Sequence, residues 1–276
     1  MKNNDTIFLR STNNAQKKPS PKIGMAFIFL IILQSYLLPL IAVASGTDYN
    51  KYTNYAYLYT ISSYTIVVLS IIIFHTNGLD VFQDHFSLWI IVLTCFFRAS
   101  LGGYNEVTYK GVLIFLGLVL SNYIIAHRKS IKIPSLKSVF IGLLWSLGTI
   151  VAIALLRLLL DPNPETFPSN LSAYIINVSV FQLSFVTVIE EAYFRGLLFG
   201  FLVMYGYKEN TALFIQAVLF WGIHYMKIAD PIYFFLLVPL FTLSATLIIK
   251  KYKMLYLSIM MHTLNNVFEG ILVAIF

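Results

Sequence analysis

The chain has 276 residues, of which 58% are hydrophobic and 11% are charged, and its mean hydropathy is +0.78. This composition leaves too little polar surface to cover a water-soluble globule of that size, so an ordinary soluble domain is excluded. The formal net charge of +7 does not indicate nucleic acid binding, because the basic residues lie between apolar segments, where they orient a membrane protein. The single cysteine, Cys95, excludes a disulfide framework, and we expect it to be a buried structural thiol.

Residues 1–22 are polar and basic, and they predict a cytoplasmic tail. The apolar run that follows, at 23–45, is too long for the core of a signal peptide and predicts a first membrane span. Further spans are predicted at 55–75, 86–97, 108–126, 137–160, 171–205, 211–226, 230–249 and 254–276, the third of them short. The predicted fold class is therefore all-α, a polytopic transmembrane helical bundle of about eight or nine spans.

The distribution of basic residues predicts the orientation of these spans in a cell membrane. With nine crossings and a cytoplasmic N-terminus, thirteen of the nineteen Lys and Arg residues lie on the inner side. Removing the short third span would turn the basic 127–137 loop outward, so the charge pattern favours keeping it. His75, His85 and His127 lie at span ends, and we expect them to be solvated. The connections are short and indicate one membrane domain without an inserted soluble part.

Ionisable groups within a span are costly, so each is a candidate functional residue. Three patterns of this kind occur in the C-terminal spans: Glu190 and Glu191 with Arg195 one helical turn later, Phe220 with His224, and His262 with Asn266. Counting the rise per residue from the helix ends places Glu190 roughly 22 Å, His224 roughly 20 Å and His262 roughly 15 Å into the membrane. Three separate helices are thus predicted to bring polar groups to one depth.

Such a set of groups suits the activation of water. A carboxylate and an imidazole together can take a proton from water, and neutral or cationic donors can hold the oxygen that becomes negative. The four-residue spacing lets Arg195 neutralise Glu191, which leaves Glu190 as the candidate base. On the third helix, His262 and Asn266 share a face and could polarise a substrate carbonyl.

These three motifs, in this order on successive hydrophobic helices, resemble those of the CPBP family. That family comprises the type II CAAX prenyl endopeptidases and the bacterial Abi and bacteriocin-processing proteins. The resemblance covers 171–276, so the chain divides into the tail at 1–22, N-terminal spans at 23–170 and a catalytic part at 171–276. It implies an intramembrane endopeptidase in which Glu190 and His224 activate water, Glu191 and Arg195 support them, and His262 with Asn266 stabilises the oxyanion.

The resemblance implies a peptide or protein substrate at the membrane, and it leaves the substrate open among prenylated CAAX proteins, bacteriocin or pheromone precursors and immunity targets. No cofactor is expected: two His and two Glu could ligate zinc, but the HExxH spacing of soluble zinc proteases is absent, and metal-free catalysis is favoured. The alternative function is a non-hydrolytic membrane protein, either an immunity or regulatory factor or a proton-coupled transporter that uses the same groups as a relay.

Overall fold

The structure is a computed structural model, and it describes residues 20–44, 49–75, 82, 84–101, 107–128, 135–160 and 170–275. Within these residues all extended regular structure is helical, which confirms the predicted all-α class. The first five helices are α1 (Pro21–Ala44), α2 (Tyr49–Phe74), α3 (His85–Ser100), α4 (Val107–Ala126) and α5 (Leu136–Leu160). Residues 1–19 of the predicted tail lie outside the described residues.

The C-terminal part begins with one long helical rod that runs through α6 (Leu171–Phe181), α7 (Thr187–Glu191) and α8 (Phe199–Met204). Two π-helical segments, at Gln182–Val186 and Ala192–Leu198, join these three helices. Three helices follow: α9 (Glu209–Ile223), α10 (Val238–Tyr252, preceded by a π-helical turn at Tyr233–Leu237) and α11 (Leu255–Ile275).

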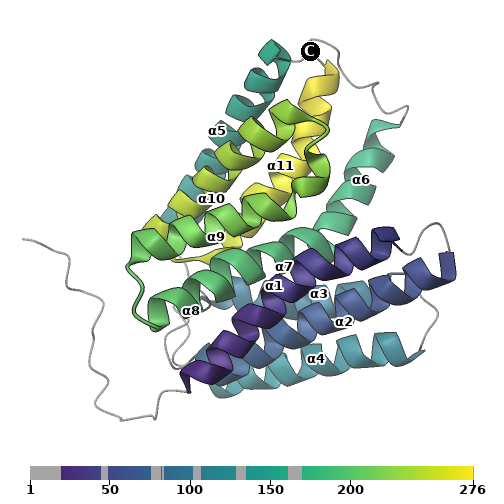
Figure 1. Cartoon of the computed structure of the whole chain (residues 1–276), viewed down its shortest axis with the longest axis vertical. Helices are drawn as coiled ribbons and strands as arrows, with labels where there is room; N and C mark the ends of the chain where they lie inside the picture. The colour runs from purple at the N-terminus through teal and green to yellow at the C-terminus, as the bar shows by residue number, and fades with distance from the viewer. Residues whose placement is uncertain are drawn as a thin grey trace, which may run out of the picture.

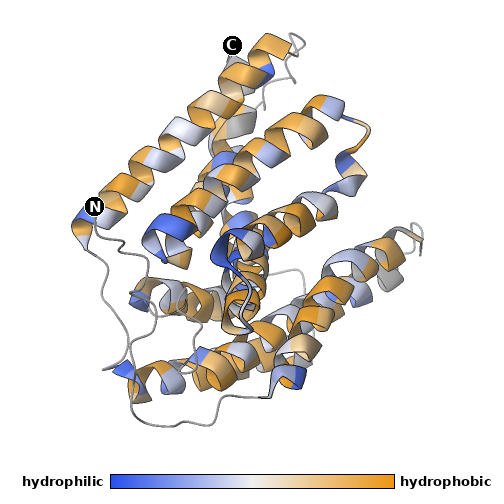
Figure 2. Ribbon diagram, turned by 60° about the vertical axis from the view of Figure 1, so that its left-hand side comes forward, coloured by the Kyte–Doolittle hydropathy of each residue, from blue (hydrophilic) through white to orange (hydrophobic). Residues whose placement is uncertain are grey.

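Six helical segments in the described chain are long and apolar enough to cross a membrane, which makes the protein a multi-pass membrane protein. They lie at Pro21–Ile41, Asn54–Phe74, Val107–Ala126, Leu136–Leu160, Leu171–Met204 and Tyr233–Tyr252. The other three predicted spans fall on α3, a shorter apolar helix of 16 residues, and on α9 and α11. Figure 2 shows apolar residues along most of each helix and polar residues gathered mainly near helix ends, as a lipid environment requires.

The helices form two groups with the long rod between them (Figure 1). On one side α1 packs against α2, α2 against α4, and α3 against α4. On the other side α5 packs closely against α11, and α10 packs against α5, α9 and α11. The sequence division at residue 170 therefore separates α5 from helices that it contacts in space.

Two predictions about single residues can be compared directly with this packing. Cys95 is fully buried in α3 and unpaired, as expected of a structural thiol. The expectation that His75 is solvated is wrong, because only 2% of its surface is exposed and its Nδ1 lies 3.2 Å from the hydroxyl oxygen of Tyr123. The end of α2 is covered by α4 at this point, and span limits alone could not reveal that cover.

Candidate active site

The two adjacent glutamates lie on α7, a short α-helical stretch between the two π-helical segments. A π-helical turn contains an additional residue and is frequent at functional sites. Here the hydroxyl of Thr187 donates to the carbonyl of Gln182, five residues earlier, at 3.0 Å. The rod also crosses α11 at this level, since Thr187 and Thr263 share a hydroxyl hydrogen bond of 3.0 Å.

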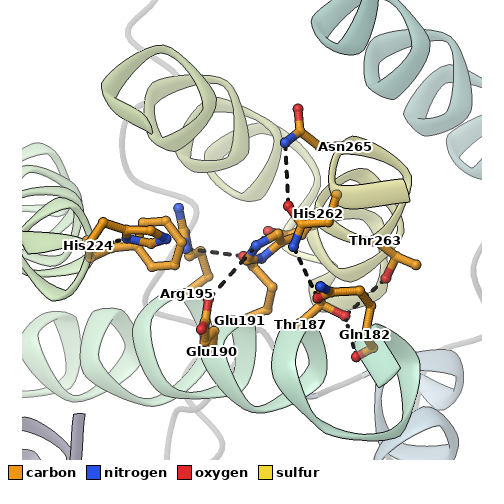
Figure 3. Close-up of polar contacts among 12 residues, drawn as sticks. Gln182, Thr187, Glu190, Glu191, Arg195, His224, His262, Thr263 and Asn265 are labelled. Atoms are coloured by element: carbon orange, nitrogen blue, oxygen red, sulfur yellow. Dashed lines mark hydrogen bonds and ion pairs between the residues drawn. The ribbon is translucent and has the colours of Figure 1, made fainter. Parts of the chain in front are cut away.

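Glu191 is fully buried, and its carboxylate contacts three polar side chains (Figure 3). Its Oε1 lies 3.1 Å from Nη1 of Arg195 and 2.8 Å from Nδ1 of His262, and its Oε2 accepts a hydrogen bond from Ser258. The Glu191–Arg195 pair predicted from the four-residue spacing is therefore present. Because a buried carboxylate without partners is very costly, these three contacts hold Glu191 in one orientation.

Arg195 is also fully buried, and it is bound by an aromatic ring as well as by a carboxylate. The centre of its guanidinium lies 3.6 Å from the centroid of the Phe220 ring on α9, a cation–π distance. Phe220, with no exposed surface, also contacts the His262 ring at a centroid distance of 5.8 Å. The first residue of the FxxxH motif thus packs against the charged pair of the first motif.

His262 lies between the two glutamates. Its Nδ1 faces Glu191 and its Nε2 lies 3.8 Å from Oε2 of Glu190. Since the ionised Glu191 can only accept, Nδ1 carries a proton and Nε2 is left to accept a proton or, in the charged ring, to donate one. Glu190 differs from its fully buried neighbour in that 23% of its side chain is exposed.

A small cavity lies between α5, α9, α10 and α11. Three of the predicted site residues, His224, His262 and Asn266, line it. Its lining comprises Ile153, His224, Tyr233, Leu237, Val238, Phe241, His262, Asn265 and Asn266. The space open to the centre of a water molecule is about 20 Å³, enough for roughly one water. His224, just past the end of α9, places Nδ1 2.9 Å from the Phe220 carbonyl oxygen, which fixes the ring and leaves Nε2 available.

Asn266 is held by a residue that the sequence did not single out. Its Nδ2 donates to Oε1 of Gln182 at 3.0 Å, and Asn265 lies alongside, with Nδ2 3.5 Å from Oδ1 of Asn266. Gln182 begins the first π-helical segment, so the rod orients the amide of the third motif.

The structure thus brings all six predicted residues into one connected region, with Glu190, Glu191 and Arg195 on the rod and His224, His262 and Asn266 around the cavity. Sequence reasoning missed Ser258 and Gln182 as their partners. Ser258 precedes His262 by four residues and could have been noticed as a third polar residue on that helix face. For Gln182 the sequence holds no such signal, because its contact spans 84 residues.

The donor set does not fit zinc in this arrangement. Among the described residues, no three His, Cys, Asp or Glu side chains are placed to hold one metal ion, whereas zinc in proteins takes three or four protein ligands. Both oxygens of Glu191 already accept hydrogen bonds, and Nδ1 of His262 is one of the donors.

The comparisons with known proteins agree with the motifs. Residues 170–268 match the family model described as Type II CAAX prenyl endopeptidase Rce1-like, a segment that contains every predicted site residue. Neither the curated proteins nor the solved structures give a match to the chain. The three motifs and their shared site lie within this matched segment, which is similar to the Rce1-like type II CAAX prenyl endopeptidases of the CPBP family.

Proposed function

We propose that the protein is an intramembrane endopeptidase that hydrolyses a peptide bond in a membrane-associated peptide or protein. The observation that carries this proposal is the meeting of two carboxylates, two imidazoles and an amide beside a cavity of about one water. The family of the matched segment consists of intramembrane CAAX endopeptidases, which supports a peptide or protein substrate.

In this proposal Glu190 is the general base. It is the carboxylate that is partly exposed, whereas Glu191 is fully occupied by Arg195, His262 and Ser258. A water beside Glu190 and the free nitrogen of His224 would lose its proton as it attacks the carbonyl carbon. Glu191 and Arg195 are positioning groups, because Glu191 holds His262, Arg195 holds Glu191, and both side chains are fully buried.

His262 and Asn266 are the proposed hydrogen-bond donors to the carbonyl oxygen that becomes negative. The Asn266 amide donates one N–H to Gln182 and has a second N–H for the cavity. His262 donates from Nε2 only in its charged form, since Nδ1 already donates to Glu191. In that form the ring would offer a charged donor to the oxyanion.

The proposal is tested with purified protein in liposomes and a panel of substrates that includes a farnesylated CAAX peptide and apolar peptides of unrelated sequence. Newly formed peptide ends are identified by mass spectrometry. We expect Glu190→Gln and His224→Ala to lower the rate at least about 100-fold, the usual range for loss of a general base.

The matched control is Glu209→Gln, which changes a surface carboxylate at the start of α9 that pairs with Lys253. It should cleave at the rate of the unchanged protein. If Glu190→Gln cleaved as fast as Glu209→Gln, the proposed base would be wrong. A protein that folds normally yet cleaves no member of the panel, while protecting cells or moving protons, would support the non-hydrolytic alternative.

A further inference from the structure

A second, wider depression lies on the outer surface of the helix pair α5 and α10. Its volume is about 350 Å³, within the range of ligand pockets. It is lined by Trp145, Gly148, Thr149, Ala152, Leu240 and Ser244. We call it the α5–α10 groove. It is distinct from the cavity of the candidate active site, with which it shares no lining residue.

The groove is a formed surface and not a gap between loosely placed helices. Trp145 donates from Nε1 to the hydroxyl oxygen of Ser244 at 2.7 Å, and Thr149 lies 2.6 Å from the same oxygen. These contacts join α5 to α10 along the floor. Above the floor, Gly148 is exposed, and a side chain added there would meet no atom within 4 Å.

One end of the groove is positively charged. Nζ of Lys251 lies 5.7 Å from the centroid of the Trp145 ring, so an exposed ammonium group stands at the rim. Lys250 is the next exposed cation on α10. Neither α5 nor α10 contains an Asp or Glu residue, and the last turn of α10 lies at the same end as Lys137 in the first turn of α5.

We propose that the α5–α10 groove binds one anionic phospholipid of the cytoplasmic leaflet. The phosphate and its negative headgroup lie beside Lys251, and one acyl chain runs along Gly148 and Ala152. From Trp145 to Ala152 the groove follows α5 for seven residues, about 10 Å, which is long enough for part of an acyl chain. Basic pockets between transmembrane helices on the cytoplasmic side have the chemistry that recognises such headgroups.

The test measures bound lipid and does not depend on proteolytic activity. Protein reconstituted with phosphatidylglycerol and phosphatidylcholine of identical chains is extracted gently, and retained lipid is counted by native mass spectrometry. We expect one phosphatidylglycerol to be retained in preference to phosphatidylcholine. Lys251→Gln should lower that preference about five-fold. Gly148→Leu, whose Cβ would meet no neighbouring atom and whose side chain would occupy the groove, should remove the retained lipid.

Each variant has a matched control. Gly111→Leu adds the same side chain at another exposed helical glycine with open space, on α4, and Lys22→Gln removes an exposed cation from α1. Both should retain lipid as the unchanged protein does. Equal retention of the two lipids, or equal loss in Gly148→Leu and Gly111→Leu, would overturn the proposal. A change from dimer to monomer in Gly148→Leu would also overturn it, because a second copy would then occupy the groove.

Discussion

Ser258 is the residue whose contribution is easiest to isolate. Its hydroxyl donates to Glu191, the buried carboxylate on which His262 is oriented. Removing one partner of a buried charged group costs about 1–3 kcal/mol of stability. We expect Ser258→Ala to lower the unfolding free energy by that amount and to lower kcat about tenfold with little change in KM, since Ser258 does not line the cavity.

Ser121→Ala is the control for this change, since that hydroxyl bonds only to the Gly117 carbonyl of its own helix in the contacts described. Thermal unfolding and steady-state cleavage of the two variants are compared. Equal behaviour of Ser258→Ala and Ser121→Ala would show that the hydrogen bond to Glu191 has no part in the site.

The contact between Glu191 and His262 also predicts that the proposed activity does not depend on a metal ion. Because Glu191 and one nitrogen of His262 bind each other, three free ligands for zinc are not brought together in the part of the chain that the structure describes. We expect cleavage to continue in the presence of a strong chelator. The measurement is the cleavage rate with and without chelator, together with the metal content of the purified protein. Loss of activity that added zinc restores, with about one metal per chain, would refute a metal-free mechanism.

At the scale of elements, the start of α11 depends on α3. Asp84 caps α3 by accepting from the Ser87 amide at 2.7 Å and from the Ser87 hydroxyl at 2.5 Å. The same Ser87 oxygen accepts the Tyr256 amide at 2.9 Å, which is one of the unsatisfied first-turn donors of α11. The helix that carries His262 and Asn266 is thus anchored to the N-terminal group of helices.

This anchor predicts a pH dependence of stability. Burial is the largest cause that raises the pKa of Asp84, from 3.8 to about 6, although its hydrogen bonds with Ser87 oppose the shift. A folded-state pKa above the unfolded value means that this group favours the folded protein at low pH and that the benefit is lost as pH rises through about 6. We expect Asp84→Asn, which keeps an acceptor oxygen, to flatten the fall in melting temperature between pH 4 and 7. An unchanged pH profile in Asp84→Asn would contradict this.

Much of the element structure follows from the sequence, because apolar runs of sufficient length predict helices in a membrane. The predicted runs at 108–126 and 137–160 differ from α4 and α5 by one residue at an end. The pairing of Glu191 with Arg195 also follows, since it needs only helical spacing. The two π-helical segments, the contact of Gln182 with Asn266 and the position of α5 beside α11 do not follow, because they arise from packing between distant parts of the chain.

For the whole molecule, the basic residues predict a cytoplasmic N-terminus and nine crossings. We expect a cysteine introduced by Ser11→Cys, in a chain with Cys95→Ala, to react with a membrane-impermeant maleimide only after cells are permeabilised. Glu165→Cys in the same background lies in a connection predicted to be external and should react in intact cells. Reaction of Ser11→Cys in intact cells would invert the topology, and reaction of both on one side would change the number of crossings.

The size of the site cavity has a consequence for turnover. A space that holds about one water cannot also hold a peptide unit, so a peptide substrate does not fit the cavity as described. In the proposed function, cleavage would begin with a separation of helices around the cavity, and collective helix motions of this kind take microseconds to milliseconds. Because such an opening displaces lipid, its rate responds to bilayer thickness and lateral pressure. The membrane would thereby influence the rate of catalysis in addition to solvating the helices.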